Sequence, residues 1–302
     1  MPEVRTVAVI GAGIMGRGIA HAAALGGYRT ILEDILPTTL RRAGDEIRSN
    51  LDKAVELGKV SQTDADHAFS RIEYASSVEQ AAREADLVIE AVPEEMESKL
   101  EIFTLLDKVC RPATIIASNT SSLSITEIST ATYRRDRCVG MHFFNPVHKM
   151  KLIEVIRALE TSDETLAAAV EVGRRMGKEI VVIKEAPGFI TSRMNALIGN
   201  EAFHMLGEGI ATAEDIDKAL KLGLNHPMGP FELVDLVGLD TRLRILEYLH
   251  TTLGEKYRPA PLLIEFVKTG RLGRKSGRGV YDYHPSSPSH ADRLTPRVAL
   301  LS

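Results

Sequence analysis

The sequence predicts an α/β fold in which a domain built on a mainly parallel sheet precedes an all-helical C-terminal domain. Over residues 1–184, short β-branched apolar runs alternate with longer segments whose apolar residues recur every three or four positions. Runs such as Val7–Ile10 and Leu87–Ile89 are almost continuously apolar, which is typical of strands covered on both faces. After Ala186-Pro187-Gly188 the strand-like runs disappear and helical patterns take over.

Eight strands are expected in the first part of the chain. They are Arg5–Ile10, Arg29–Glu33, Arg71–Tyr74, Leu87–Ala91, Thr114–Ala117, Cys138–Phe143, Lys151–Ile156 and Glu179–Ile183. Helical patterns lie between the earlier strands, as in Leu36–Leu57 and Met96–Val109. Strand, helix and strand at this spacing form βαβ units, and we therefore expect parallel pairing.

In the second part of the chain, Gly and Pro separate helical segments. Examples of the expected helices are Ile190–Leu206, Ala213–Leu222, Phe231–Val237 and Thr241–Leu253. We place the domain boundary so that residues 1–184 form the first domain and residues 185–283 the helical domain. Residues 284–302 are rich in Ser and Pro without periodicity, and we expect this tail to be poorly ordered.

The composition is that of an ordinary globular protein, and it argues against some classes of partner. The 302 residues carry a formal net charge of −4, so the basic excess that favours nucleic acid is missing. No run of about 18 apolar residues predicts a membrane span. The two cysteines, Cys110 and Cys138, are too few for a disulfide framework or a metal site, which favours a reducing cytoplasm.

A glycine pattern follows the first strand directly and precedes an Ala-rich helical stretch that runs to Leu25. In this pattern Gly11 permits a tight turn, Gly13 lets the backbone approach a pyrophosphate, and Gly16 lets helix and strand pack closely. The N-terminus of the helix adds N–H groups and the positive end of its dipole. The pattern predicts a Rossmann-type dinucleotide-binding domain, with cofactor contacts from Gly11, Gly13, Ile14, Met15 and Gly16.

The second strand ends beside an acidic residue, Asp34, which lies 23 residues after Gly11. A carboxylate there accepts hydrogen bonds from the ribose hydroxyls of adenosine and repels a 2′-phosphate, which favours NAD over NADP. Glu33 could instead be the residue that faces the cofactor. Arg41 and Arg42, which follow on the next helix, temper the preference for NAD over NADP. The structural alternative is that Asp34 caps the helix that starts near Pro37.

A histidine ends the sixth strand, and a glutamate lies twelve residues later in the seventh. If these strands pair antiparallel with a turn near His148, residues whose numbers sum to 296 lie opposite each other, as His142 and Glu154 do. A carboxylate so placed accepts the N–H of one imidazole nitrogen and fixes the tautomer, leaving the other nitrogen to take a proton. A lone histidine in a strand is more often structural. Here the glutamate opposite it and the dinucleotide-binding pattern favour a catalytic pair.

Four further motifs, in this order along the chain, carry a resemblance to a known family. They are Ser118-Asn119-Thr120-Ser121-Ser122-Leu123, His142-Phe143-Phe144-Asn145-Pro146, Pro187-Gly188-Phe189 and Asn225-His226-Pro227-Met228-Gly229-Pro230-Phe231. So spaced, they resemble the L-3-hydroxyacyl-CoA dehydrogenase family, and most nearly its bacterial 3-hydroxybutyryl-CoA members, to about Tyr283. The resemblance implies a Rossmann-type domain, a helical C-terminal domain that forms a homodimer, and a His–Glu pair at the cleft between the domains.

The resemblance also implies roles for individual residues. The catalytic histidine corresponds to His142, its orienting glutamate to Glu154, and the serine that hydrogen-bonds the substrate to Ser121. The implied cofactor contacts are Asp34, Glu94, Lys99, Ser121, Asn145 and Lys275. For the CoA portion of the substrate we expect contacts from Lys53, Ser121 and Lys99, although a solvated helix lysine is an equal alternative for Lys53.

The chain departs from the family at one active-site position. The family has Asn-Arg after Pro-Gly-Phe-x-x, whereas Ser192 precedes Arg193 here. Serine keeps a donor and an acceptor but is shorter, so a direct hydrogen bond could become water-mediated. Asn195, one helical turn on, is an alternative substitute, and Arg193 is as readily a structural ion-pair partner.

The expected function is NAD-dependent oxidation of a 3-hydroxyacyl-CoA, with His142 as proton acceptor and Glu154 orienting it. Three other functions stay open. A superfamily dehydrogenase acting on a sugar acid such as gulonate would share the glycine turn and the histidine. A non-catalytic NAD-binding protein could keep the fold, since fold does not fix function. A helical interaction module would use only the C-terminal half.

Overall fold

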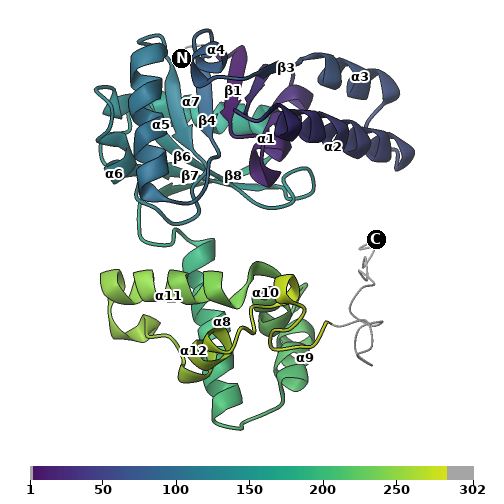
Figure 1. Ribbon diagram of the computed structural model, residues 1–302, viewed down its shortest axis with the longest axis vertical. Coiled ribbons are helices and arrows are strands. Elements are labelled where there is room, and N and C mark those ends of the chain that lie inside the picture. The colour runs from purple at the N-terminus through teal and green to yellow at the C-terminus, as the bar shows by residue number, and fades with distance from the viewer. Residues whose placement is uncertain (1–2, 284–302) are drawn as a thin grey trace. The chain divides into compact units, whose positions relative to one another are not determined.

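The structure is a computed structural model that describes residues 3–283, so the expectation for residues 284–302 lies outside the described residues. The chain divides into two compact units between Phe189 and Ile190 (Figure 1). The sequence predicts this boundary five residues earlier, between residues 184 and 185. Each unit has its own apolar core and is described by itself.

The first unit is built on one eight-stranded sheet with strand order β3-β2-β1-β4-β5-β6-β7-β8. The strands are β1 Thr6–Ile10, β2 Arg29–Glu33, β3 Ile72–Ala75, β4 Leu87–Glu90, β5 Ile115–Ser118, β6 Cys138–Phe143, β7 Leu152–Arg157 and β8 Glu179–Lys184. Neighbouring strands pair parallel except β6 and β7, which pair antiparallel. The mainly parallel sheet is thus confirmed, and each expected strand forms within one residue of its predicted ends.

Helices cover both faces of this sheet (Figure 1). They are α1 Ile14–Leu25, α2 Pro37–Glu56, α3 Gln62–Ser70, α4 Val78–Ala82, α5 Met96–Val109, α6 Ile125–Ser129 and α7 Asp163–Arg175. Successive strand residues point to opposite faces, so Val7 and Val9 pack with α1, α2, α3 and α7, whereas Ala8 and Ile10 pack with α4, α5 and α6. This two-sided burial explains the continuous apolar runs of the sequence.

The second unit is helical, as the sequence predicts. Its helices are α8 Thr191–Gly207, α9 Ala213–Gly223, α10 Pro230–Val237, α11 Leu239–Leu253 and α12 Pro261–Lys268. Phe203 and Phe231 meet edge to face in its core, with ring centroids 5.2 Å apart. Asp217 of α9 accepts hydrogen bonds from the first turn of α10 and from the Tyr281 hydroxyl, which ties the C-terminal segment to the helices.

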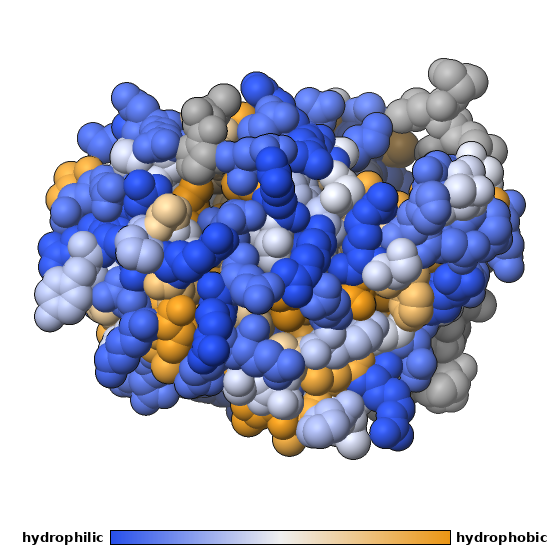
Figure 2. Space-filling view, turned by 90° about the horizontal axis from the view of Figure 1, so that it is seen from above, coloured by the Kyte–Doolittle hydropathy of each residue, from blue (hydrophilic) through white to orange (hydrophobic). Residues whose placement is uncertain are grey.

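The surface seen in Figure 2 is mainly hydrophilic, and its apolar residues form small separate groups. Scattered apolar side chains of this kind are normal on protein surfaces. Among residues 3–283, no helix combines the length and the apolar character needed to cross a bilayer.

Candidate active site

The glycine turn joins β1 to α1 as the sequence predicts. Gly11 has φ +95°, a conformation that favours glycine, and its N–H donates to the carbonyl of Glu33 at the end of β2. A Cβ on Gly16 would lie 1.7 Å from the Gly11 carbonyl oxygen, so only glycine lets the helix pack this closely on the turn. A Cβ on Gly13 would meet no protein atom within 4 Å, which leaves open space above the first N–H groups of α1.

The two acidic residues at the end of β2, Glu33 and Asp34, differ in their environments. Asp34 accepts hydrogen bonds from the N–H of Ala12 in the glycine turn and from the N–H of Leu36 before α2. It therefore contacts the turn and also supports the start of the helix. Glu33 is 3% exposed, and burial, followed by the charge of Asp34, raises its pKa to about 7.

His142 and Glu154 face each other across the antiparallel pair β6 and β7, in the register that the sequence predicts. Nδ1 of His142 lies 2.8 Å from Oε2 of Glu154, and both side chains are buried. With Glu154 ionised, Nδ1 is the donor and Nε2 is the nitrogen that can accept a proton. The rings of Phe144 and Phe189 pack around the imidazole at centroid distances of 4.4 and 5.9 Å.

A hollow of the first unit collects five of the residues predicted for the site: Met15, Glu94, Ser121, His142 and Asn145. Ala91, Val92, Asn119, Phe143 and Phe144 complete its lining. Met15 belongs to the first turn of α1, so the hollow connects the glycine turn with the His–Glu pair. Strand ends supply most of this lining, which is where ligands bind in open parallel sheets.

Glu94 holds the turn that carries Ser121. Its Oε1 accepts hydrogen bonds from the Thr120 hydroxyl at 2.6 Å, from the Ser121 N–H at 2.7 Å and from the Ser121 hydroxyl at 3.0 Å. Burial opposes ionisation of Glu94, but the Lys99 charge and these hydrogen bonds hold its pKa below the ordinary value. Glu94 is therefore an ionised acceptor at the edge of the hollow.

Lys99 is 1% exposed and forms an ion pair with Glu90, with Nζ 2.8 Å from Oε1. Its Nζ also lies 3.4 Å from Oε2 of Glu94. Glu90 ends β4 and accepts two further hydrogen bonds, from the Val92 N–H at 2.8 Å and from the Ser118 hydroxyl at 2.6 Å. The charged group of Lys99 thus lies behind Glu94 and not at the surface.

The other predicted residues do not line this hollow. Lys53 is exposed on α2, in a shallow depression with Asp45, Arg48, Ser49, Asp52 and Glu56. Ser192 and Lys275 belong to the second unit, where Ser192 is half-buried in the first turn of α8 and Lys275 is ion-paired with Asp240 at 2.5 Å.

Sequence reasoning gave no role to Glu90 or Asn119. The side chain of Asn119 accepts the N–H of Phe143 at 2.9 Å and so fixes the strand end beside His142. Their positions in the sequence indicate a place in the site. Glu90 ends one buried parallel strand and Asn119 directly follows the next, and the carboxyl ends of such strands meet at one edge of the sheet.

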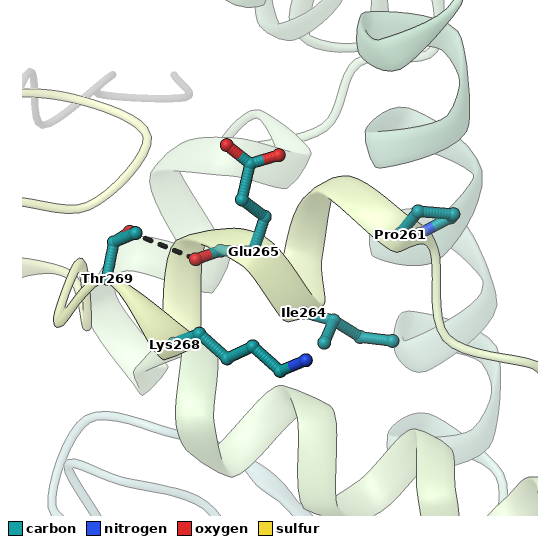
Figure 3. A pocket seen from close by; sticks show the side chains of 5 residues that line it. All are labelled: Pro261, Ile264, Glu265, Lys268 and Thr269. Atoms are coloured by element: carbon teal, nitrogen blue, oxygen red, sulfur yellow. Dashed lines mark hydrogen bonds between the residues drawn. The ribbon is translucent and has the colours of Figure 1, made fainter.

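A second hollow, over α12 in the second unit, is lined by side chains of a single segment (Figure 3). Its residues are Pro261, Ile264, Glu265, Lys268 and Thr269, and the Thr269 hydroxyl donates to the Glu265 carbonyl at 3.0 Å. Chemistry needs groups that converge from several elements, and this lining comes from one. The hollow of His142 is therefore the candidate active site.

The chain is similar to known proteins over almost all of its described residues. Residues 6–186 match the family model described as 3-hydroxyacyl-CoA dehydrogenase, NAD binding domain, and residues 188–283 match the C-terminal domain of the same family. The chain is 47% identical over 282 residues to a probable 3-hydroxybutyryl-CoA dehydrogenase of Bacillus subtilis, covering 93% of this chain and 98% of that protein.

Two other similar proteins come from Bradyrhizobium diazoefficiens and Ralstonia eutropha. A 3-hydroxybutyryl-CoA dehydrogenase of the former is 45% identical over 286 residues, covering 94% of this chain and 97% of that protein. The crystal structure of (S)-3-hydroxybutyryl-CoA dehydrogenase from the latter superposes with a TM-score of 0.91 at 44% identity. That match covers 93% of this chain and 100% of the solved chain.

Proposed function

Since the chain belongs to the 3-hydroxyacyl-CoA dehydrogenase family of NAD-dependent enzymes, we propose that it reversibly oxidises (S)-3-hydroxyacyl-CoA to 3-ketoacyl-CoA. The proposed substrate is 3-hydroxybutyryl-CoA, after the relatives named for it. The observation that carries the proposal is the 2.8 Å contact of His142 with Glu154, in a hollow that reaches the glycine turn.

The glycine turn fits NAD. The open space above Gly13 and the N–H groups of α1 suit a pyrophosphate, and Asp34 suits the ribose of adenosine. Gly11, Gly16, Ile14 and Met15 would hold the dinucleotide together with these residues. Further contacts are proposed from Glu94, Asn145 and Lys275, and the family resemblance suggests Lys99 as another.

NAD supplies the hydride acceptor, and the chain supplies binding, orientation and proton transfer. Nε2 of His142 takes the proton of the 3-hydroxyl, while Glu154 holds the ring and places a negative charge beside the imidazolium. Ser121 hydrogen-bonds the substrate oxygen, and Ser192 is proposed to take the place of the family asparagine. In the reverse direction His142 returns the proton.

The CoA portion of the substrate and a second copy of the chain are further proposed partners. Lys53 and Ser121 are proposed contacts for the CoA portion, for which the family resemblance also suggests Lys99. The helical unit is proposed to form a homodimer. Free Cys110 and Cys138, both buried, support a reducing cytoplasm as the site of action.

A substrate comparison tests the function. Purified protein is given NADH and either acetoacetyl-CoA or free acetoacetate, and NADH absorbance is followed. We expect turnover of the thioester only, whereas turnover of free keto acids or of a keto derivative of gulonate would favour the sugar-acid dehydrogenase. NADH binding without turnover of any of these would favour the non-catalytic protein, and a chain-length series of 3-ketoacyl-CoA thioesters would then define the acyl preference.

A further inference from the structure

Two buried charged residues lie behind the candidate active site without lining it. Glu90 is fully buried and Lys99 is 1% exposed. Burying an ion is costly unless it is paired and hydrogen-bonded, and Glu90 meets this requirement through Lys99, Val92 and Ser118. The position of the Lys99 ammonium is therefore fixed by the end of β4.

Glu94 links this pair to the hollow. Its Oε2 faces the Lys99 ammonium at 3.4 Å, while its Oε1 accepts the hydrogen bonds of Thr120 and Ser121. The two oxygens of one carboxylate thus join a buried cation to the turn that carries Ser121. A shift at the Lys99 end would rotate the carboxylate and move its acceptor away from that turn.

We propose that Glu90 and Lys99 form a buried positioning pair, in which the Lys99 ammonium, held by Glu90, orients the Glu94 carboxylate and through it the Ser121 turn. This proposal rests on the proposed function, because it takes Ser121 and Glu94 as parts of the active site. It replaces the direct cofactor and CoA contacts that the family resemblance suggests for Lys99 by an indirect role, because the ammonium is buried and a direct contact would need it to be accessible.

The electrostatic consequence concerns the protonation of Glu94. The Lys99 charge is the largest of the causes that lower the pKa of this carboxyl, whereas burial raises it. Without Lys99, Glu94 would bind a proton at higher pH, and a protonated carboxyl offers fewer acceptor sites to Thr120 and Ser121. Loss of Lys99 should therefore appear as a new acid limb in the pH profile.

A double-mutant cycle tests the proposal with Lys99→Met, Glu94→Gln and the combined variant. Acetoacetyl-CoA reduction (kcat/KM) is measured between pH 5.5 and 9, and the Kd of NADH is measured by fluorescence titration. Lys99→Met should lower kcat/KM about tenfold at neutral pH, with the loss growing as pH falls. In the Glu94→Gln background the same substitution should change kcat/KM and Kd less than about twofold. Additive losses with no new acid limb would overturn the proposal.

Two further variants separate positioning from folding. Lys108→Met makes the same change at an exposed position of α5 and should match the wild type. Glu90→Gln/Lys99→Met removes the pair without leaving an unpaired buried charge, so it should fold and still show the new acid limb. A wild-type pH profile in this variant contradicts the proposal even if Lys99→Met alone fails to fold. Lack of turnover by the wild type refutes the proposed function. The Kd of NADH, measured over the same double-mutant cycle, then still tests the positioning pair.

Discussion

Nδ1 of His142 and Oε2 of Glu154 lie 2.8 Å apart between β6 and β7, the one antiparallel pair in the sheet of residues 3–189. Opposite residues of antiparallel strands share a face, so the sheet itself brings imidazole and carboxylate together. Because both side chains are buried, few other orientations are open to the ring. The backbone register thus places the imidazole next to its carboxylate partner, which contacts Nδ1.

Glu154→Gln should slow turnover by about 10- to 100-fold, the range seen when groups that orient a functional histidine are changed. Glutamine keeps the size of the side chain but removes the negative charge beside the protonated ring. The measurement is kcat at saturating NADH and acetoacetyl-CoA. Glu160→Gln, an exposed change just after β7, is the control and should match the wild type.

His142→Ala should lower kcat by about 10²- to 10⁴-fold, the usual contribution of a positioned general acid or base. The Kd of NADH should change little, because the glycine turn and Asp34 do not depend on the imidazole. Stopped-flow turnover and fluorescence titration measure the two quantities. Near-normal turnover would exclude His142 as the proton acceptor.

The His142–Glu154 contact could be predicted from the sequence because the two residues are twelve positions apart in strands joined by one turn. Side chains alternate between the two faces of a strand, so this spacing puts both on the same face. The eight strands could be predicted for a similar reason, since buried parallel strands have a strong local signal. The contact of Lys99 with Glu90 could not be predicted in this way. It depends on how the irregular segment of residues 91–95 places the first turn of α5 against the end of β4, and no periodicity reports that path.

Gly13, which precedes α1, and Gly16, in the first turn of α1, should respond to alanine in different ways. Gly16→Ala places a Cβ 1.7 Å from the Gly11 carbonyl oxygen, so the turn must distort and the Tm should fall. Gly13→Ala meets no protein atom within 4 Å and has φ −64°, so the Tm should stay unchanged. Its Cβ would occupy space proposed for the pyrophosphate, and the Kd of NADH should rise about tenfold or more.

Thermal unfolding and NADH titration of both variants check this pair. Unchanged NADH affinity in Gly13→Ala would mean that the pyrophosphate does not approach this turn. The contrast between the variants matters more than either value, because it separates packing within the protein from contact with the cofactor.

Because of Glu33, the free energy of unfolding should decrease as the pH rises from about 4.5 to 7. Burial and the neighbouring Asp34, with a smaller contribution from Glu79, raise its pKa to about 7 from an ordinary value of 4.5. Between these values the fold holds a proton that the unfolded chain has released. The free energy of unfolding therefore decreases by up to about 1.4 kcal/mol per pH unit as pH rises through this window.

Glu33→Gln is neutral at every pH and should remove this slope. Its free energy of unfolding relative to the wild type should rise from pH 4.5 to 7 and then stay constant, as measured by urea unfolding at several pH values. Glu97→Gln, exposed in the first turn of α5, is the matched control and should follow the wild type. Parallel pH curves for Glu33→Gln and the wild type would mean that Glu33 is ionised in the fold. A buried negative charge would then lie beside Asp34, next to the turn proposed to bind a pyrophosphate.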